Sequence, residues 1–323
     1  MGFSVYDVSI MSKEASNMTN LQKWVEQYLT ACKYQKGLDT KTIKAYRIDL
    51  SQFILFAGRG ETNLTRSSMM EYISDLHQKY KPRTIRRKIA SVKAFCGYLE
   101  YEELITENPF TKLQLKLNAP LILPRTIPFS VIEAILSTAY QQGQRERLSE
   151  KQQQTVLRDI AVLELLFATG IRVSELCSLK CADVNLIEGE VKIYGKGAKE
   201  RLVQIGNPGV LSALQAYQAL NCLAIEHTGM FFVNRLDKPL SDQSVRNIVA
   251  KYTRLAGENL HITPHMFRHS FATLLLEEDV DIRYIQRLLG HSSIVTTQIY
   301  TYVSGRKQRD ILSIKHPRNK IRV

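Results

Sequence analysis

Apolar side chains recur at the three- and four-residue spacing of an α-helix through most of the first hundred residues. The longest stripe consists of Ile85, Ile89, Val92, Phe95 and Leu99. Earlier stripes lie within residues 24–29, 43–56 and 69–76. Asp39 precedes the second of these, as expected for a helix N-cap. We therefore predict a four-helix domain over residues 21–105, preceded by an N-terminal extension of residues 1–20.

The helical pattern stops between residues 106 and 125, where prolines are frequent, and this is typical of an interdomain linker. A second domain is predicted over residues 126–323. Helical patterns return at 129–140, 155–169, 210–224, 241–256, 264–277 and 282–289. Two short β-prone runs, 190–194 and 201–205, flank a glycine-containing turn and predict a hairpin. The fold class is therefore mostly α, with a small antiparallel β-sheet in the second domain.

Local signals mark several helix ends in this domain. Gly170 follows an almost wholly apolar stretch and suits its C-terminal cap. Thr263 and Asp281 are predicted N-caps of the last two helices. The polar, glutamine-rich stretch 141–154 is expected to be an exposed loop or a helix extension.

The chain of 323 residues is basic, with 44 Lys and Arg against 31 Asp and Glu, a net charge of +13. Such an excess favours a polyanionic partner: nucleic acid first, an acidic lipid surface second. No apolar run approaches the roughly 18 residues of a membrane span. We expect a cytoplasmic protein without a membrane partner. The five cysteines are scattered, which argues against a disulfide framework or a zinc module.

A basic patch without acidic residues lies within residues 79–93. On a helix, Arg83, Arg86 and Arg87 share a face opposite the apolar stripe, a geometry suited to gripping DNA phosphates. The predicted DNA-binding residues are Arg83, Arg86, Arg87 and Lys88. The alternative is an ordinary solvated helix face, although such faces usually carry both signs of charge.

Five strings concentrate residues that carry chemistry. They are ATGIRVSEL at 168–176, GKGAKER at 195–201, TPHMFRH at 263–269, LGHS at 289–292 and TTQIY at 296–300. In sequence and mutual spacing they resemble the tyrosine recombinase (phage integrase) family, most closely its Xer-type bacterial members. The resemblance covers both domains and implies a SAM-like core-binding domain followed by a catalytic domain.

Transfer of a DNA phosphodiester onto a protein needs donors to the phosphate oxygens, a nucleophile and an acid for the leaving oxygen. Arg172 and Arg268 offer permanently charged, bidentate forks. His265 lies three residues before Arg268 on one helix face, so both can point at one phosphate. The pair His265 and His269 lacks a third ligand, so no metal is expected.

The resemblance assigns the remaining roles. Lys196 is implied as the general acid, with Lys199 as its rival, and His291 as a donor to the phosphate. Glu175 is implied as a structural acid that supports the pocket. Tyr300 is implied as the nucleophile, and Tyr302 is the competing candidate. Because a covalent 3′-phosphotyrosyl link keeps the energy of the cut bond, no ATP, metal or other cofactor is expected.

The resulting expectation is a site-specific recombinase that cuts and rejoins duplex DNA through a Holliday junction. The family implies a homotetramer on two synapsed recombination sites, with a second recombinase or accessory protein left open, and association with the nucleoid. Chromosome dimer resolution, integration of a mobile element and inversion all stay open as the biological task. The alternatives are a type IB topoisomerase-like relaxing enzyme and a catalytically silent DNA-binding protein.

Overall fold

The computed structural model describes residues 20–58, 64–111, 113, 124–195 and 200–290. The chain divides into two compact units, residues 1–121 and 122–323, called here the first and second unit. No helix within the described ranges is long and apolar enough to cross a membrane.

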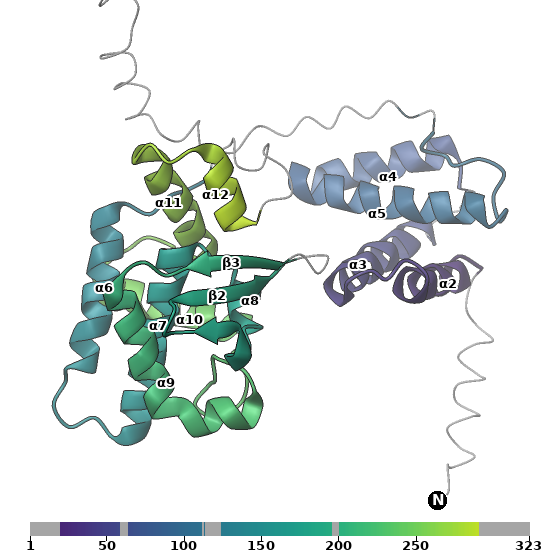
Figure 1. Ribbon diagram of the computed structural model, residues 1–323. Helices are drawn as coiled ribbons and strands as arrows, with labels where there is room; N and C mark the ends of the chain where they lie inside the picture. The colour runs from purple at the N-terminus through teal and green to yellow at the C-terminus, as the bar shows by residue number, and fades with distance from the viewer. Residues whose placement is uncertain (1–19, 59–63, 112, 114–123, 196–199, 291–323) are drawn as a thin grey trace, which may run out of the picture. The chain divides into compact units, whose positions relative to one another are not determined.

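The described part of the first unit contains the four predicted helices (Figure 1). They are α2 (Asn20–Tyr34), α3 (Thr40–Ala57), α4 (Arg66–Lys79) and α5 (Pro82–Tyr101). The Asp39 side chain caps α3 by accepting a hydrogen bond from the backbone N–H of Lys41. Thr65 and Ser68 form a capping box on α4, and Pro82 occupies the first turn of α5. The predicted helices are therefore confirmed.

Aromatic and aliphatic side chains from all four helices form the core of this unit. Tyr28 packs against Phe95 with ring centroids 5.6 Å apart, and Phe53 meets Tyr72 edge-on at 5.0 Å. Helix α5 contributes its whole apolar stripe, which leaves the opposite face of the helix to solvent.

The second unit is built around the buried helix α7 (Glu150–Thr169), which contacts α6 (Phe129–Gly143), α9 (Pro208–Thr228), α10 (Asp242–Leu255) and α11 (Pro264–Glu277). Helix α12 (Ile282–Leu289) follows α11 and touches strand β3 (Figure 1). The short α8 (Val173–Cys177) and a 3-10 turn (Cys181–Asp183) come directly after α7. Ser149 caps α7, so the polar stretch 141–154 contains the end of α6, a short connection and the first turn of α7.

The sheet has three antiparallel strands in the order β1 (Val184–Asn185), β2 (Glu190–Tyr194) and β3 (Glu200–Gln204). In the hairpin, Val191 pairs with Val203 and Tyr194 with Glu200. The predicted hairpin and the mostly α class are confirmed, with β3 beginning one residue earlier than predicted. Strand β1, the 3-10 turn and α8 were not predicted, because each is too short to produce a periodic pattern.

Two glycine caps shape the chain within the strings 168–176 and 289–292. Gly170 ends α7 with φ of 58°, and Gly290 ends α12 with φ of 64°. A Cβ atom on Gly170 would lie 2.6 Å from the ring of Phe271. Both turns therefore require glycine, and they direct the chain out of α7 and α12 at neighbouring points on the unit.

Candidate active site

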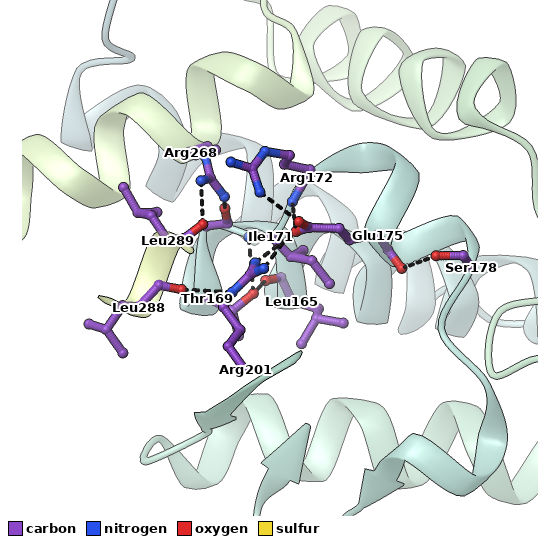
Figure 2. A network of polar contacts seen from close by, with 11 residues as sticks. Leu165, Thr169, Ile171, Arg172, Glu175, Ser178, Arg201, Arg268, Leu288 and Leu289 are labelled. Atoms are coloured by element: carbon purple, nitrogen blue, oxygen red, sulfur yellow. Dashed lines mark hydrogen bonds and ion pairs between the residues drawn. The ribbon is translucent and has the colours of Figure 1, made fainter. Parts of the chain in front are cut away.

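The candidate site lies where the α7–α8 junction, strand β3, helix α11 and the end of α12 meet (Figure 2). Arg172 is the N-cap residue of α8, one turn before Glu175. The backbone N–H of Arg172 donates to Glu175 at 3.0 Å, and its Nη1 donates to Oε1 at 2.6 Å. About a third of the Arg172 side chain (32%) is exposed to solvent. Glu175 thus anchors one terminal nitrogen of a guanidinium on a half-buried side chain.

Arg201 of strand β3 binds the same carboxylate. Its Nη2 lies 2.7 Å from Oε2 of Glu175, and its Nη1 lies 3.1 Å from Oε1. The Nε atom donates to the backbone carbonyl of Leu288 in α12 at 3.0 Å. Glu175 therefore binds two arginines, Arg172 with 32% and Arg201 with 10% of the side chain exposed, and Figure 2 shows both at its carboxylate.

Arg268 is buried on α11, with 4% of its surface exposed. Nη1 donates to the carbonyl of Gly170 at 2.7 Å, and Nη2 donates to the carbonyl of Leu289 at 2.6 Å. These oxygens belong to the C-terminal ends of α7 and α12, where helices leave acceptors without partners. Arg268 thus joins the two glycine-capped helix ends, which carry partial negative charge.

The pKa of Glu175 reflects two opposed effects. Burial alone would raise it, but the hydrogen bonds and positive charge of Arg201 and Arg172 outweigh burial and hold the pKa below its usual range. The carboxylate is therefore ionised at neutral pH, and it carries the negative charge that both arginines need in this buried place.

His265 stands in the first turn of α11, three residues before Arg268. Partial burial of the ring and the positive charges of Arg268, Arg246 and Arg172 lower its pKa. The imidazole is therefore neutral at pH 7. The charges of Arg268 and Arg172 thus both act on His265, and so does the charge of the exposed Arg246 of α10, which was not predicted as a site residue.

Lys196, His291 and Tyr300, with the rivals Lys199 and Tyr302, lie outside the described residues. The elements that lead to them are described: β2 and β3 flank residues 196–199, and Gly290 precedes His291. Arg201 was not predicted as a site residue. The available signal was its place at the end of the 195–201 string, but its partner Glu175 is 26 positions away in the chain.

The predicted DNA-binding residues of the first unit divide into two groups. Arg83 and Arg86 are exposed on α5, and Arg87 is partly exposed while it bonds to Asp49. Lys88 does not fit its predicted role, because only 2% of its surface is exposed and its ammonium faces Asp49 and Gln52. Because Asp49 and Gln52 hold this ammonium inside the core of the first unit, between α5 and α3, we remove Lys88 from the set.

Within the described residues, no cluster of three or more His, Cys, Asp or Glu side chains is arranged to hold a metal ion. The site that is described consists of donors: two arginines, a histidine and the network that orients them. Such a constellation suits an anion with several oxygens, and the net charge of +13 favours a phosphodiester of a nucleic acid as that anion.

Comparison with known proteins identifies this class. Residues 127–306 match the phage integrase family, and residues 25–103 match the phage integrase N-terminal SAM-like domain. The chain therefore belongs to the phage integrase family. It is a Xer-type tyrosine recombinase, an enzyme that breaks and rejoins DNA strands.

The curated relatives cover nearly the whole chain. A tyrosine recombinase of Agathobacter rectalis is 54% identical over 93% of this chain and 98% of its own length. Tyrosine recombinase XerC of Thermodesulfovibrio yellowstonii is 36% identical over 94% and 99%. Tyrosine recombinase XerD of Halalkalibacterium halodurans is 35% identical over 93% and 100%.

Solved structures share the fold at lower identity. XerH site-specific recombinase bound to palindromic difH substrate, in a post-cleavage complex, matches with a TM-score of 0.72 and 22% identity, over 90% of this chain and 84% of that one. A lambda integrase tetramer bound to a Holliday junction matches with a TM-score of 0.63 and 16% identity, over 88% and 78%.

Proposed function

We propose that this enzyme recombines two DNA sites through a 3′-phosphotyrosyl intermediate on Tyr300 and a Holliday junction, as a homotetramer on two synapsed sites. The observation that supports this most directly is that Arg268, three residues after His265 on α11, donates to the carbonyl of Gly170, two residues before Arg172. The family membership supports the recombinase activity, and the lambda integrase tetramer on a Holliday junction supports the assembly.

In this proposal the two arginines bind the nonbridging oxygens of the scissile phosphate. Glu175 engages one terminal nitrogen of Arg172, and the exposed side of that guanidinium reaches the phosphate. Arg268 is fixed by two carbonyls, so its charge is in place before DNA arrives. A guanidinium that is preorganised in this way stabilises the charge of the transition state without moving.

The proposed chemical step moves two protons. The Tyr300 oxygen attacks phosphorus and its proton passes to His265, which accepts it because the ring is neutral at pH 7. The bond between phosphorus and the 5′ oxygen breaks, and Lys196 donates a proton to that oxygen. Rejoining reverses the step, with the 5′ hydroxyl of another strand as the attacking group, so the cut bond's energy is conserved.

The experiment first selects a bound sequence from a pool of duplexes with a randomised centre. A nick is then placed near the cleavage point, so that the short fragment diffuses away and the covalent adduct accumulates. We expect an adduct with the wild-type chain and with Tyr302→Phe, and none with Tyr300→Phe. The two variants lose the same hydroxyl two residues apart, so they are matched. Binding without an adduct in the wild-type chain contradicts the proposal, as does an adduct in Tyr300→Phe.

A second assay separates recombination from simple relaxation. Supercoiled plasmids with two copies of the selected sequence should yield recombinant products, whereas a plasmid without the sequence should stay supercoiled. Relaxation of both plasmids to the same extent, without recombinants, would indicate a topoisomerase-like enzyme.

A further inference from the structure

We propose that Arg201 is a positioning residue of the strand-cleavage reaction. It fixes the Glu175 carboxylate, and through it Arg172, relative to the end of α12 from which the chain runs to His291. This inference rests on the proposed function, because it concerns how the same site is held. No motif or role considered above assigns a task to Arg201.

The contacts of Arg201 use all three of its guanidinium nitrogens. Nη1 and Nη2 bind the two oxygens of Glu175 at 3.1 and 2.7 Å, and Nε binds the carbonyl of Leu288 at 3.0 Å. The side chain is 10% exposed, so these bonds form away from water. The planar guanidinium group of arginine can make all three contacts at once, and a lysine ammonium cannot reproduce this geometry.

Arg201 is not the only donor to the Glu175 carboxylate. The carboxylate already accepts hydrogen bonds from the side chain and backbone of Arg172, at 2.6 and 3.0 Å. With Arg201 absent, Glu175 would attract Arg172 alone, and the guanidinium would shift toward the carboxylate. Arg201 therefore determines where the Glu175 carboxylate lies. The position of this carboxylate in turn determines where the Arg172 guanidinium lies.

Arg201 and Arg268 hold consecutive carbonyls at the end of α12. Arg201 binds the oxygen of Leu288, and Arg268 binds the oxygen of Leu289. The helix end is thus clamped between strand β3 and helix α11. Arg268 of this clamp is a proposed phosphate ligand. Arg201 is linked through Glu175 to Arg172, the other proposed phosphate ligand.

Gly290 gives a second, independent observation of this clamp. A Cβ atom at this position would lie 2.9 Å from Nη1 of Arg201 and 3.1 Å from its Cδ. The backbone leaving α12 therefore lies directly against the Arg201 side chain. An added methyl group would push on Arg201 without removing its charge.

The first test compares binding with cleavage. Affinity for the selected nicked duplex and the single-turnover rate of adduct formation at saturating protein are measured for Arg201→Met, Arg201→Lys and Lys192→Met. Lys192 pairs with Glu200 on the surface of the same hairpin, so it is the matched control. We expect Arg201→Met to bind within about twofold of wild type and to cleave about 10- to 100-fold more slowly, because a small misplacement has such effects. Arg201→Lys should recover part of the rate, and Lys192→Met should match the wild-type rate.

The second test does not require an Arg201 variant to fold. Gly290→Ala is compared with Gly229→Ala, because Gly229 also caps a helix with a positive φ, 67°, but has no atom within 4 Å of an added Cβ. Both substitutions place an alanine at a positive φ, 64° and 67°, and only the first contacts Arg201. We expect Gly290→Ala to lower the cleavage rate about tenfold and Gly229→Ala to leave it unchanged.

A double variant tests whether Arg201 affects the cleavage rate through Glu175. In a Glu175→Gln background, Arg201→Met should lower the rate by less than about threefold, because the shared carboxylate no longer exists to be misplaced. The Arg201 proposal is overturned if Arg201→Met cleaves at the wild-type rate, if binding and cleavage fall in proportion, or if Gly290→Ala and Gly229→Ala behave alike. Failure of the proposed function is distinguishable, because the wild-type chain would then form no Tyr300-dependent adduct in the same assay.

Discussion

The ammonium nitrogen of Lys88 lies 3.1 Å from a carboxylate oxygen of Asp49, and both side chains are buried between α5 and α3. The second oxygen of Asp49 accepts a hydrogen bond from Ser91 at 2.9 Å and also binds Arg87. Lys88 lies over the ring of Tyr80, 4.8 Å from its centroid. Asp49 therefore holds together a buried polar cluster next to the basic face of α5.

Replacing Asp49 with Asn should destabilise the first unit by about 3 to 5 kcal/mol, because it leaves the Lys88 cation buried without a counter-charge. Urea unfolding followed by Trp24 fluorescence measures this, because Trp24 is the single tryptophan of the chain and packs against the core of this unit. The matched control is Glu26→Gln, which breaks the exposed 2.5 Å pair with Arg47 and should cost less than about 1 kcal/mol. Equal losses in the two variants would contradict the role given to Asp49.

The exposed arginines of α5 should bind the phosphate groups of DNA and not its bases. Arg83→Ala or Arg86→Ala should weaken binding to all duplexes similarly and reduce the slope of log affinity against log salt by about 1. Lys88→Met, measured where circular dichroism shows it folded, should leave the slope unchanged because Lys88 is buried. A loss confined to one DNA sequence with an unchanged slope would mean that these arginines read bases.

Local signals explain which parts of the fold were predictable. The last two described helices, α11 and α12, begin and end where the sequence predicts, because Pro264, Asp281 and Gly290 act within one turn of the helix ends they mark. Thr263 is the N-cap of α11, yet its side chain makes no capping bond. Strand β1 spans two residues and depends on its pairing with β2, which no local pattern encodes.

The same distinction applies to the site. The strings contain Arg172, Glu175, His265 and Arg268, and the structure brings them together. Arg201 acts through partners far away in the chain, so its task is visible only in three dimensions. The burial of Lys88 was predictable, because this residue lies three positions after Ile85 and four before Val92, on the buried face of α5.

His269 should make the second unit less stable as the pH falls. Burial, with the neighbouring charges of His265 and Arg268, lowers its pKa to about 4. An unfolded chain has a histidine pKa of about 6.5, so between pH 6.5 and 4 the unfolded state binds more protons than the folded state. The stabilisation is complete above pH 6.5 and is lost as the pH falls toward 4.

We expect the free energy of unfolding to fall by about 2 to 3 kcal/mol over this range from His269 alone. Calorimetry at pH 7 and pH 5 on the wild-type chain and on His269→Gln measures the difference, which should shrink in the variant. His265 titrates with the same sign, so part of the decrease should persist in His269→Gln. An identical pH dependence in the two proteins would show that His269 is not held neutral by the fold.

Lys196 is proposed as the acid that protonates the leaving 5′ oxygen, and a substrate with a different leaving atom tests this role. A general acid contributes about 10²- to 10⁴-fold, so Lys196→Ala should cleave ordinary DNA slower by a factor in that range. When the 5′ bridging oxygen is replaced by sulfur, the leaving thiolate needs no proton, because a thiol has a pKa near 8.5. Lys196→Ala should then cleave at nearly the wild-type rate.

Two matched variants make this result specific. Arg172→Ala should stay slow on the sulfur substrate, because Arg172 is proposed to bind nonbridging oxygens that the substitution does not change. Lys199→Ala should cleave both substrates at nearly the wild-type rate. If sulfur restores Lys199→Ala and leaves Lys196→Ala slow, the acid is Lys199. If sulfur restores neither lysine variant but both are slow on ordinary DNA, the two lysines stabilise the phosphate, and the proton reaches the leaving oxygen from another donor.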